Sequence, residues 1–186
     1  MGEAGSAQPR RGEHWTVRGN PIRRTRKGTK GSNPFLSAKS PAEHLRAGPS
    51  AMGNRVFEQS IVIREEHLDT FGHVNNARYL EIFEQARWDL ITDNGFGLEY
   101  VKSSGTGPVI LELSLRFLRE VKNRQHMLIR SFLDSYEGKI GRMTQLLIDD
   151  TDQVCCEGKF VIAQWDTATR KIILPTPEWC HAVGLE

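Results

Sequence analysis

The sequence has few cysteines and no long apolar run. Three cysteines among 186 residues, two of them adjacent (Cys155 and Cys156), do not make a disulfide scaffold, so a reduced, intracellular setting is expected. No apolar run approaches the roughly 20 residues that a transmembrane helix requires, which argues against membrane insertion. The length fits one domain with some excess. We therefore predict a cytoplasmic protein.

Acidic residues are scarce at the start of the chain. Residues 1–55 contain 3 acidic and 11 basic side chains, whereas residues 56–186 contain 20 acidic and 14 basic ones. The near-neutral total thus combines a basic tail with an acidic domain. Contacts to phosphates need clustered Lys and Arg, so an acidic domain argues against a nucleic-acid partner.

Large apolar side chains are also rare in residues 1–55, which are rich in Gly, Pro, Ser and Arg. Such a composition predicts a disordered basic tail. Three interpretations are open: a start site placed too far upstream or an expression remnant, because Met52 would begin a compact domain; a tail without function; or an Arg-rich targeting peptide, although Gly and Pro interrupt any amphipathic helix. The run at 23–27 also permits a nucleic-acid-binding arm, but such runs are more often only solvated.

From residue 56 onwards the pattern predicts an α+β domain. A strand is expected at 56–63 and a helix from Asn75 or Asn76 to about Asp93. Period-two or β-rich runs then predict strands at 109–119, 126–136, 140–148, 153–165 and 171–174. The segment 95–108 is predicted to be loop, and Pro175 and Pro177 to end regular structure. One helix would bury its apolar stripe against an antiparallel sheet, and uncovered sheet edges would favour an oligomer.

The stretch 67–88 carries the chemistry. Asp69 lies in a polar loop just before the predicted helix, where free N–H groups and the helix dipole favour negative charge. Asn75 or Asn76 can cap that helix. Its apolar face is formed at steps of three and four by Tyr79, Leu80, Phe83, Ala86, Leu90 and Ile91. This arrangement suits a reaction that builds an oxyanion.

The motif His-Leu-Asp-x-x-x-His-Val-Asn-Asn-Ala-Arg-Tyr-Leu-Glu, followed by Glu-x-Ala-Arg-Trp, resembles the hotdog-fold thioesterases. It is similar to their 4-hydroxybenzoyl-CoA thioesterase-like branch and, within it, to the bacterial long-chain acyl-CoA thioesterase III group. The resemblance covers roughly residues 56–175. It implies an antiparallel sheet wrapped around one long central helix, and a homodimer or homotetramer with its site between subunits. The family often has a proline near Val121, so the following turn is expected to differ here.

The resemblance also implies residue roles. Asp69 aligns with the catalytic carboxylate, which acts as nucleophile through a mixed anhydride or as general base on water. The backbone N–H of Asn76 would polarise the thioester carbonyl, a donor worth about 2.7–4 kcal/mol in the transition state. Gly72 would allow a tight turn, and His73 is a second acid/base or orienting candidate. Tyr79 and Phe83 would lie beside the acyl chain.

Other assignments of these side chains stay open. For the CoA phosphates the candidates, by charge alone, are Arg116, Arg119, Lys122, Arg124, Lys139 and Arg142. Asp69 could instead cap a turn, and Glu81 or Glu84 could take its place, although ion pairs with Arg78 or Arg87 are the simpler reading of these two glutamates.

A metal site and a cysteine nucleophile are both disfavoured. His67, Asp69 and His73 lie on one short loop, whereas hydrolytic zinc sites usually draw on several elements. Cys155 and Cys156 lie within a predicted strand with no apparent histidine partner. No metal or organic cofactor is expected.

The resulting hypothesis is an enzyme of fatty acid metabolism, an acyl-CoA thioesterase that hydrolyses medium- or long-chain fatty acyl-CoA to free acid and CoA. The alternatives are a thioesterase for acyl-carrier protein or for aromatic acyl-CoA, and a non-catalytic acyl-thioester-binding protein. A hotdog dehydratase is disfavoured because its His-Phe-Pro-type loop is absent.

Overall fold

The computed structural model describes residues 55–185 of the chain. The predicted basic tail falls, except for Arg55, outside the described residues. Between residues 55 and 185, none of the helices is both long enough and apolar enough to cross a bilayer.

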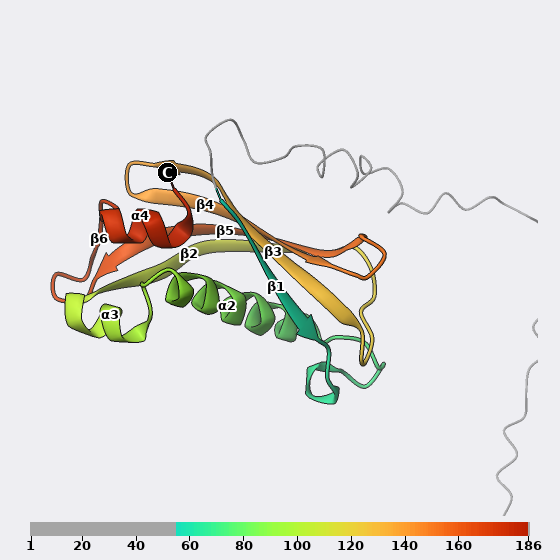
Figure 1. The fold of residues 1–186 in the computed structure, drawn as a ribbon. Helices are drawn as coiled ribbons and strands as arrows, with labels where there is room; N and C mark the ends of the chain where they lie inside the picture. Colours follow the sequence, from blue (N-terminus) through green and yellow to red (C-terminus); the bar gives the residue numbers. More distant parts are fainter. Residues whose placement is uncertain (1–54, 186) are drawn as a thin grey trace, which may run out of the picture. The chain divides into compact units, whose positions relative to one another are not determined.

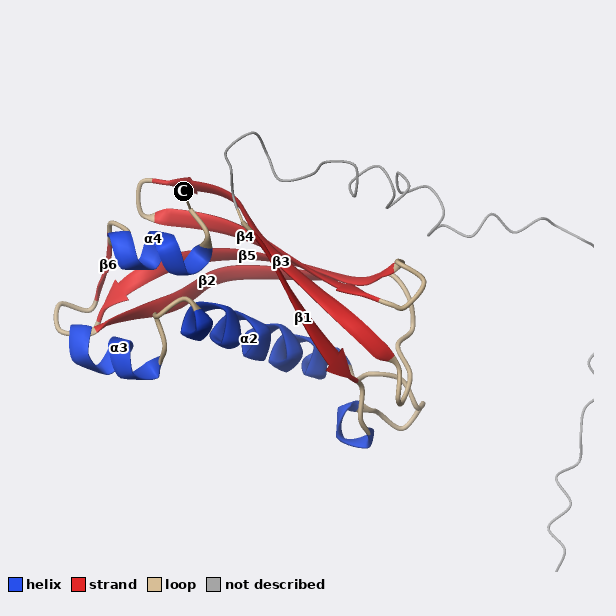
Figure 2. Ribbon diagram, in the orientation of Figure 1, coloured by secondary structure: helices blue, strands red, loops and turns tan. Residues whose placement is uncertain are grey.

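The described part is built on one antiparallel sheet with the strand order β1-β3-β4-β5-β2, and a short strand, β6, also pairs with β5 (Figures 1 and 2). The strands are β1 (Val56–Val62), β2 (Thr106–Phe117), β3 (His126–Glu137), β4 (Ile140–Ile148), β5 (Val154–Asp166) and β6 (Lys171–Ile173). The helical elements are the 3-10 turn η2 (Glu65–His67), α2 (Asn76–Asp93), α3 (Leu98–Ser104) and α4 (Pro177–Val183).

Helix α2 is the long central helix, and the strands curve over it in Figure 1. It buries Tyr79, Ile82, Phe83, Ala86, Leu90 and Ile91, which follow the spacing of three and four that the sequence predicts. These side chains form the core together with the facing residues of β3, β4 and β5. The expected α+β hotdog arrangement is therefore confirmed.

The two ends of α2 also follow the sequence. Asn75 is the N-cap residue, and its Oδ1 accepts a hydrogen bond from the N–H of Ala77 at 2.9 Å. After the C-cap residue Asn94, Gly95 adopts a left-handed conformation with φ of 84°. A short amide at the start and a glycine at the end thus delimit the helix.

Two short helices were not predicted. Helix α3 lies within the expected loop 95–108, where Gly97 and Gly105 are its caps rather than loop residues. Helix α4 begins at Pro177, so the prediction that this proline ends regular structure is wrong. Proline is well tolerated in the first turn of a helix, and the Thr176 hydroxyl accepts a hydrogen bond from the N–H of Trp179 at 3.3 Å.

The edge strand β2 contains a bulge. Its register against β5 shifts between Ile110 and Glu112, so Val109 and Phe117 do not share a face as the alternating pattern predicted. Ile110, before the bulge, pairs with Ile162, whereas after the bulge Leu113 pairs with Phe160. Both partners belong to the core against α2. The bulge therefore keeps apolar residues on the α2 side along the whole strand.

Candidate active site

The loop between η2 and α2 forms a tight turn around Asp69. The N–H of Asp69 donates to the carbonyl of His73 at 2.9 Å, and the N–H of Gly72 donates to the carbonyl of Asp69 at 3.1 Å. Gly72 has φ of 79°, which a residue with a Cβ rarely adopts. Just outside this turn, Leu68 and Val74 form an antiparallel bridge. The turn thus fixes Asp69 immediately before the helix.

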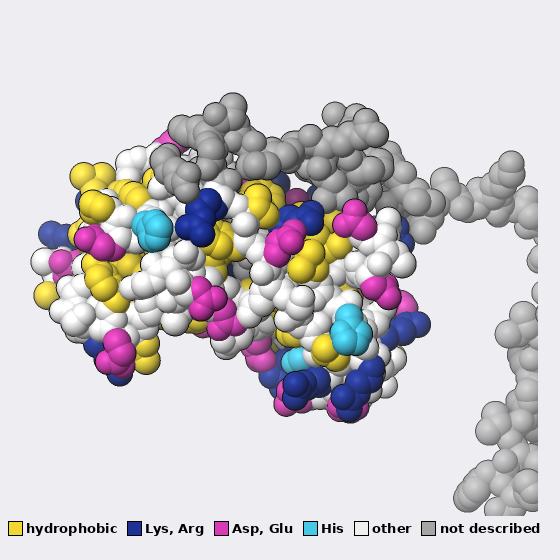
Figure 3. Space-filling model, in the orientation of Figure 1, with side chains coloured by type: hydrophobic (Ala, Val, Ile, Leu, Met, Phe, Trp, Pro, Cys, Tyr) yellow, Lys and Arg dark blue, Asp and Glu magenta, His cyan; other side chains and the backbone are white. Residues whose placement is uncertain are grey.

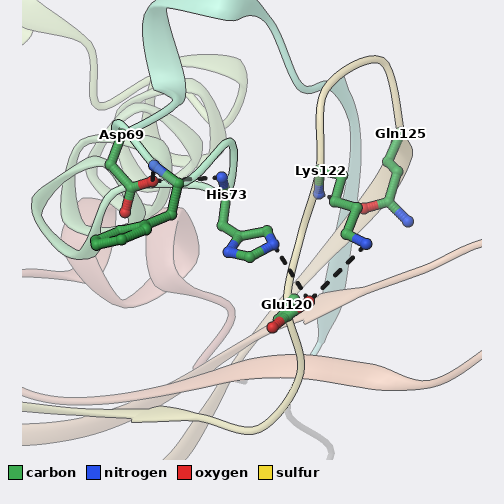
Figure 4. Close-up of polar contacts among 6 residues, drawn as sticks. Asp69, His73, Glu120, Lys122 and Gln125 are labelled. Atoms are coloured by element: carbon green, nitrogen blue, oxygen red, sulfur yellow. Dashed lines mark hydrogen bonds and ion pairs between the residues drawn. The ribbon is translucent and has the colours of Figure 1, made fainter. Parts of the chain in front are cut away.

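The Asp69 carboxylate is held by one of its two oxygens. Oδ1 accepts from the N–H of Phe71 at 2.8 Å and from the N–H of His73 at 3.4 Å (Figure 4). Oδ2 has no hydrogen-bond donor among residues 55–185. The turn-capping role weighed from the sequence is therefore real, and it leaves the second oxygen available to another molecule.

The His73 side chain turns away from Asp69. Its Nε2 lies 3.2 Å from Oε2 of Glu120, and Lys122 Nζ lies 3.9 Å from the same oxygen (Figure 4). His73 and Lys122 also form a backbone bridge. Sequence reasoning missed Glu120. The signal that was available is the departure from the family pattern at the neighbouring Val121.

A hollow of about 410 Å³ opens at the start of α2. It is lined by Asp69, His73, Val74, Asn75, Asn76, Tyr79, Phe117, Leu118, Arg119 and Glu120. Four predicted site residues, Asp69, His73, Asn76 and Tyr79, therefore share one space. Asn76 is the first residue of α2, and within the described chain its N–H makes no hydrogen bond. A carboxylate oxygen and a helix N–H are thus both available at this hollow.

The apolar wall of the hollow is aromatic. The rings of Tyr79 and Phe117 lie 5.1 Å apart, and burial raises the pKa of the Tyr79 phenol, which stays protonated at neutral pH. Phe83 is completely buried, with its ring 6.1 Å from that of Phe160. The structure therefore places Tyr79 at the hollow and Phe83 beneath it, in the core, rather than on its surface.

Comparison with known proteins decides the family. The family model described as Thioesterase-like superfamily matches residues 63–183. The chain belongs to this thioesterase-like superfamily. This membership confirms the expected class of enzyme, a thioester hydrolase.

Individual relatives agree. The chain is 29% identical over 118 residues to the long-chain acyl-CoA thioesterase FadM of Escherichia coli, an alignment that covers 63% of this chain and 89% of FadM. The structure of YbaW, a probable thioesterase from Escherichia coli, is similar with a TM-score of 0.61 and 26% identity, over 69% of this chain and 98% of that one. The DHNA-CoA thioesterase of Staphylococcus aureus has the same fold, with a TM-score of 0.62 and 18% identity, over 68% and 87%.

In this thioesterase the basic candidates divide into two groups. Arg119 lines the hollow, and its Nη2 donates to Gln153 Oε1 at 3.1 Å. Lys122 is bridged to His73, and Arg124 pairs with Glu65 at 2.7 Å. Lys and Arg side chains gather at this end of the molecule in Figure 3. The contacts of Arg119, Lys122 and Arg124 place all three near the start of α2.

The other three basic candidates do not line the hollow of their own chain. Arg116 precedes the inward-facing Phe117, so it points outward and pairs with Glu157 at 2.9 Å. Lys139 lies in the β3–β4 turn and donates to the carbonyl of Ile172 at 3.0 Å. Arg142 follows in β4, at the end of the sheet opposite the Asp69 loop (Figure 1).

The structure also bears on two alternatives to Asp69 as the catalytic carboxylate, namely a metal site with His67 and His73 and a carboxylate at Glu81. His67 Nδ1 accepts from the N–H of Arg64 at 3.1 Å, so His67 closes the 3-10 turn instead of joining Asp69 and His73. Within residues 55–185, no three His, Cys, Asp or Glu side chains are grouped to hold a metal ion. Glu81 is paired with Arg78, as the helical spacing indicates.

The two adjacent cysteines are both buried. Burial raises the pKa of the Cys155 thiol to about 11 and that of the Cys156 thiol to about 12. Both are therefore protonated at neutral pH, and neither is an activated nucleophile.

Proposed function

We propose that this thioesterase hydrolyses medium- or long-chain fatty acyl-CoA at the hollow before α2, with Asp69 as its catalytic carboxylate. The observation that carries the proposal is that the hollow holds both the free Oδ2 of Asp69 and the free N–H of Asn76, next to the aromatic wall of Tyr79 and Phe117. Hydrolysis of a thioester needs these parts: a base or nucleophile, a donor for the oxyanion and an apolar place for the acyl group.

In the proposed reaction the thioester carbonyl oxygen accepts a hydrogen bond from the N–H of Asn76. Asp69 then takes a proton from water as the water oxygen bonds to the carbonyl carbon. The carbon–sulfur bond breaks, and the departing thiolate receives that proton. Alternatively Oδ2 bonds to the carbonyl carbon, the thiolate leaves and is protonated by solvent, and water cleaves the resulting anhydride. Both routes consume one water and return Asp69 to its ionised form.

The charge around the hollow supports CoA as the leaving group. Arg119 is in its wall, and Lys122 and Arg124 are exposed nearby, so the phosphates of CoA would meet basic side chains at this end of the domain. The name of the E. coli relative FadM, a long-chain acyl-CoA thioesterase, supports the same substrate class. These observations favour acyl-CoA over a substrate without phosphates.

We also propose that the thioesterase acts as a homodimer joined along β2. This strand is an edge of the described sheet, and it exposes Leu111, Leu113 and Phe117 by 46%, 44% and 53%. An exposed apolar edge strand is a natural surface for pairing with a second copy. Pairing there would place the partner beside the hollow, because Phe117 belongs to both.

The test is the release of free thiol from a panel of acyl-CoAs of increasing chain length and from matched acyl-carrier-protein substrates. Asn at position 69 keeps an oxygen for the N–H of Phe71, so Asp69→Asn should fold and yet lose activity by about a hundredfold or more, roughly 2.7 kcal/mol of barrier. The matched control is Asp150→Asn, in the exposed β4–β5 turn. Equal activity of wild type and Asp69→Asn would show that another carboxylate acts. Inactivity on every acyl-CoA would favour a carrier-protein substrate or a binding protein.

A further inference from the structure

A second cavity lies along α2, away from Asp69. It has a volume of about 130 Å³. Its wall is mostly apolar and is formed by Glu84, Arg87, Trp88, Leu90, Ile91, Pro108, Ile110, Met143, Ile162, Trp179 and Val183. The cavity thus lies between the second half of α2, the first half of β2, and α4. A charged side chain in such a wall requires an explanation.

Arg87 is held against the sheet beside this space. Its Nη1 donates to Gln145 Oε1 at 2.7 Å, and its guanidinium lies 4.2 Å from the centre of the Phe160 ring. Gln145 is completely buried and donates in turn to the carbonyl of Phe83 and to Ser131 Oγ. The guanidinium is therefore held in one place instead of extending into solvent.

The charge of Arg87 is not matched by a close carboxylate. No ion pair within residues 55–185 includes Arg87, and Glu84, the acid that shares the cavity wall, is exposed. Burial lowers the pKa of Arg87 to about 10, with Glu84 acting in the opposite direction, so the guanidinium stays charged at neutral pH.

Most of the N–H groups of Arg87 have no protein acceptor. The Gln145 contact uses one of five donors. Within the described chain, the one buried side-chain N or O atom without a partner is Gln59 Oε1. The other Arg87 nitrogens are therefore not fully buried, and Arg87 is part of the cavity wall.

Apolar side chains lie between the two hollows. Phe117 lines the first and Ile110 the second, and between them Leu113 and Leu115 face α2 from the edge strand. Leu113 is 44% exposed in the single chain, so α2 does not seal these residues. From Asn76 to Arg87 the helix advances about 17 Å at 1.5 Å per residue. An extended chain gains about 1.2 Å per bond, so roughly 14 bonds span that distance.

We propose that the acyl chain lies along these residues between α2 and β2, and that Arg87 selects chains of roughly 14 carbons that carry a hydroxyl or keto oxygen near their far end. The inference rests on the proposed function, since it places the thioester at Asp69. An uncharged oxygen fits better than a terminal carboxylate, because a carboxylate buried in this mostly apolar cavity loses its hydration, and that loss can exceed the gain from pairing with Arg87. A plain chain would leave the guanidinium donors unpaired when it displaces water from the cavity.

The experiment compares kcat/KM for tetradecanoyl-CoA, 14-hydroxytetradecanoyl-CoA and tetradecanedioyl-CoA. For the wild type we expect the hydroxylated chain to be preferred over the plain chain by about tenfold or more, since a hydrogen bond to a charged group discriminates by at least that factor. In Arg87→Met the plain chain should become equal or better, and in Arg87→Lys part of the preference should return. Arg170→Met makes the same change in an exposed turn and should keep the wild-type ratio.

A second variant tests the position of the chain without removing Arg87. Ile110→Phe fills the cavity and should abolish the preference for the hydroxylated chain, while octanoyl-CoA, too short to reach the cavity, is still hydrolysed. Equal rates for plain and hydroxylated chains in the wild type would overturn the inference and leave the thioesterase proposal standing. A preference for the dicarboxylic chain would overturn the choice of an uncharged oxygen. Failure to hydrolyse any acyl-CoA would overturn both proposals.

Discussion

His73 is paired with Glu120, Nε2 to Oε2 at 3.2 Å, and its imidazole is not bonded to Asp69 although its backbone N–H is. The histidine therefore supports the carboxylate through the main chain, while its ring ties the loop to the β2–β3 connection. Two motif residues that lie four positions apart thus have different partners.

The first prediction separates the role of His73 from that of Asp69. His73→Ala and Glu120→Gln should each lower kcat/KM by about tenfold or less, because the ring does not reach the reacting carboxylate, whereas an acid/base group usually contributes a hundredfold or more. Steady-state kinetics beside Asp69→Asn measures the difference. A loss in His73→Ala as large as that in Asp69→Asn would show that the imidazole takes part in proton transfer.

The second prediction concerns the start of α2. Asn75→Ala should lower the free energy of unfolding by about 1 kcal/mol, because the helix loses its N-cap side chain and the N–H of Ala77 keeps only the acceptor of Asn76. Asn76→Ala should cost less, since Asn75 Oδ1 still accepts from the same N–H. Its kcat should fall little if the backbone N–H of Asn76 is the group that acts. Urea unfolding and kinetics on both variants provide the measurements.

The third prediction concerns the core beneath the hollow. Phe83→Ala should lower the free energy of unfolding by about 3–5 kcal/mol, because a fully buried ring packed on Phe160 is removed. Phe83→Leu retains most of the volume and should cost much less. Chemical denaturation distinguishes the two variants, and equal losses would contradict the placement of this ring in the core.

The fourth prediction tests the proposed dimer. Leu111→Lys places a charge on the exposed edge strand and should shift the protein from dimer to monomer in light scattering at micromolar concentration. Thiol release should fall with the fraction of dimer, whereas Lys102→Leu, on the exposed face of α3, should leave both unchanged. A wild type that is monomeric and active would contradict the interface.

The fifth prediction follows from the buried thiols. The unfolded chain loses cysteine protons from pH 9, whereas Cys155 and Cys156 in the folded chain hold theirs to about 11 and about 12. The free energy of unfolding should therefore decrease between pH 9 and 10, before the lowered pKa of Arg87 begins to act in the opposite direction. Iodoacetamide should modify both thiols slowly in the folded protein at pH 8 and rapidly in urea. Equal rates in the two conditions would contradict their burial.

The sequence predicts best where one residue spacing decides the structure. The apolar face of α2 and its Asn75 cap follow from a period of 3.6 and a short amide, and the β3–β4 turn at 137–139 follows from its glycine. The glycines and proline that begin and end α3 and α4 were less informative, because the same residue types also make loops. The bulge in β2 leaves no mark on the alternation of residue types.

The residues of the candidate site were also predicted best where they lie close together in the sequence. Asp69, Asn76 and Tyr79 come together because one loop and one helix carry them in a continuous stretch. Glu120 joins them only because the fold brings the end of β2 against that loop. Lys139 and Arg142 were named as candidates for the CoA phosphates by their charge alone, and charge does not indicate how far a residue lies from Asp69. Arg87 was read as the partner of a helix glutamate, and its packing on Phe160 depends on the facing sheet.

The bulge at Leu111 also divides β2 into two segments whose registers against β5 can change separately. Deleting Leu111 would restore simple alternation and turn Pro108 and Ile110 away from α2, while Leu113 to Phe117 would keep their positions beside the first hollow. With the proposed placement of the acyl chain, a length change of a single residue would therefore alter the end of the site that receives the tail of a substrate and leave its reactive end untouched.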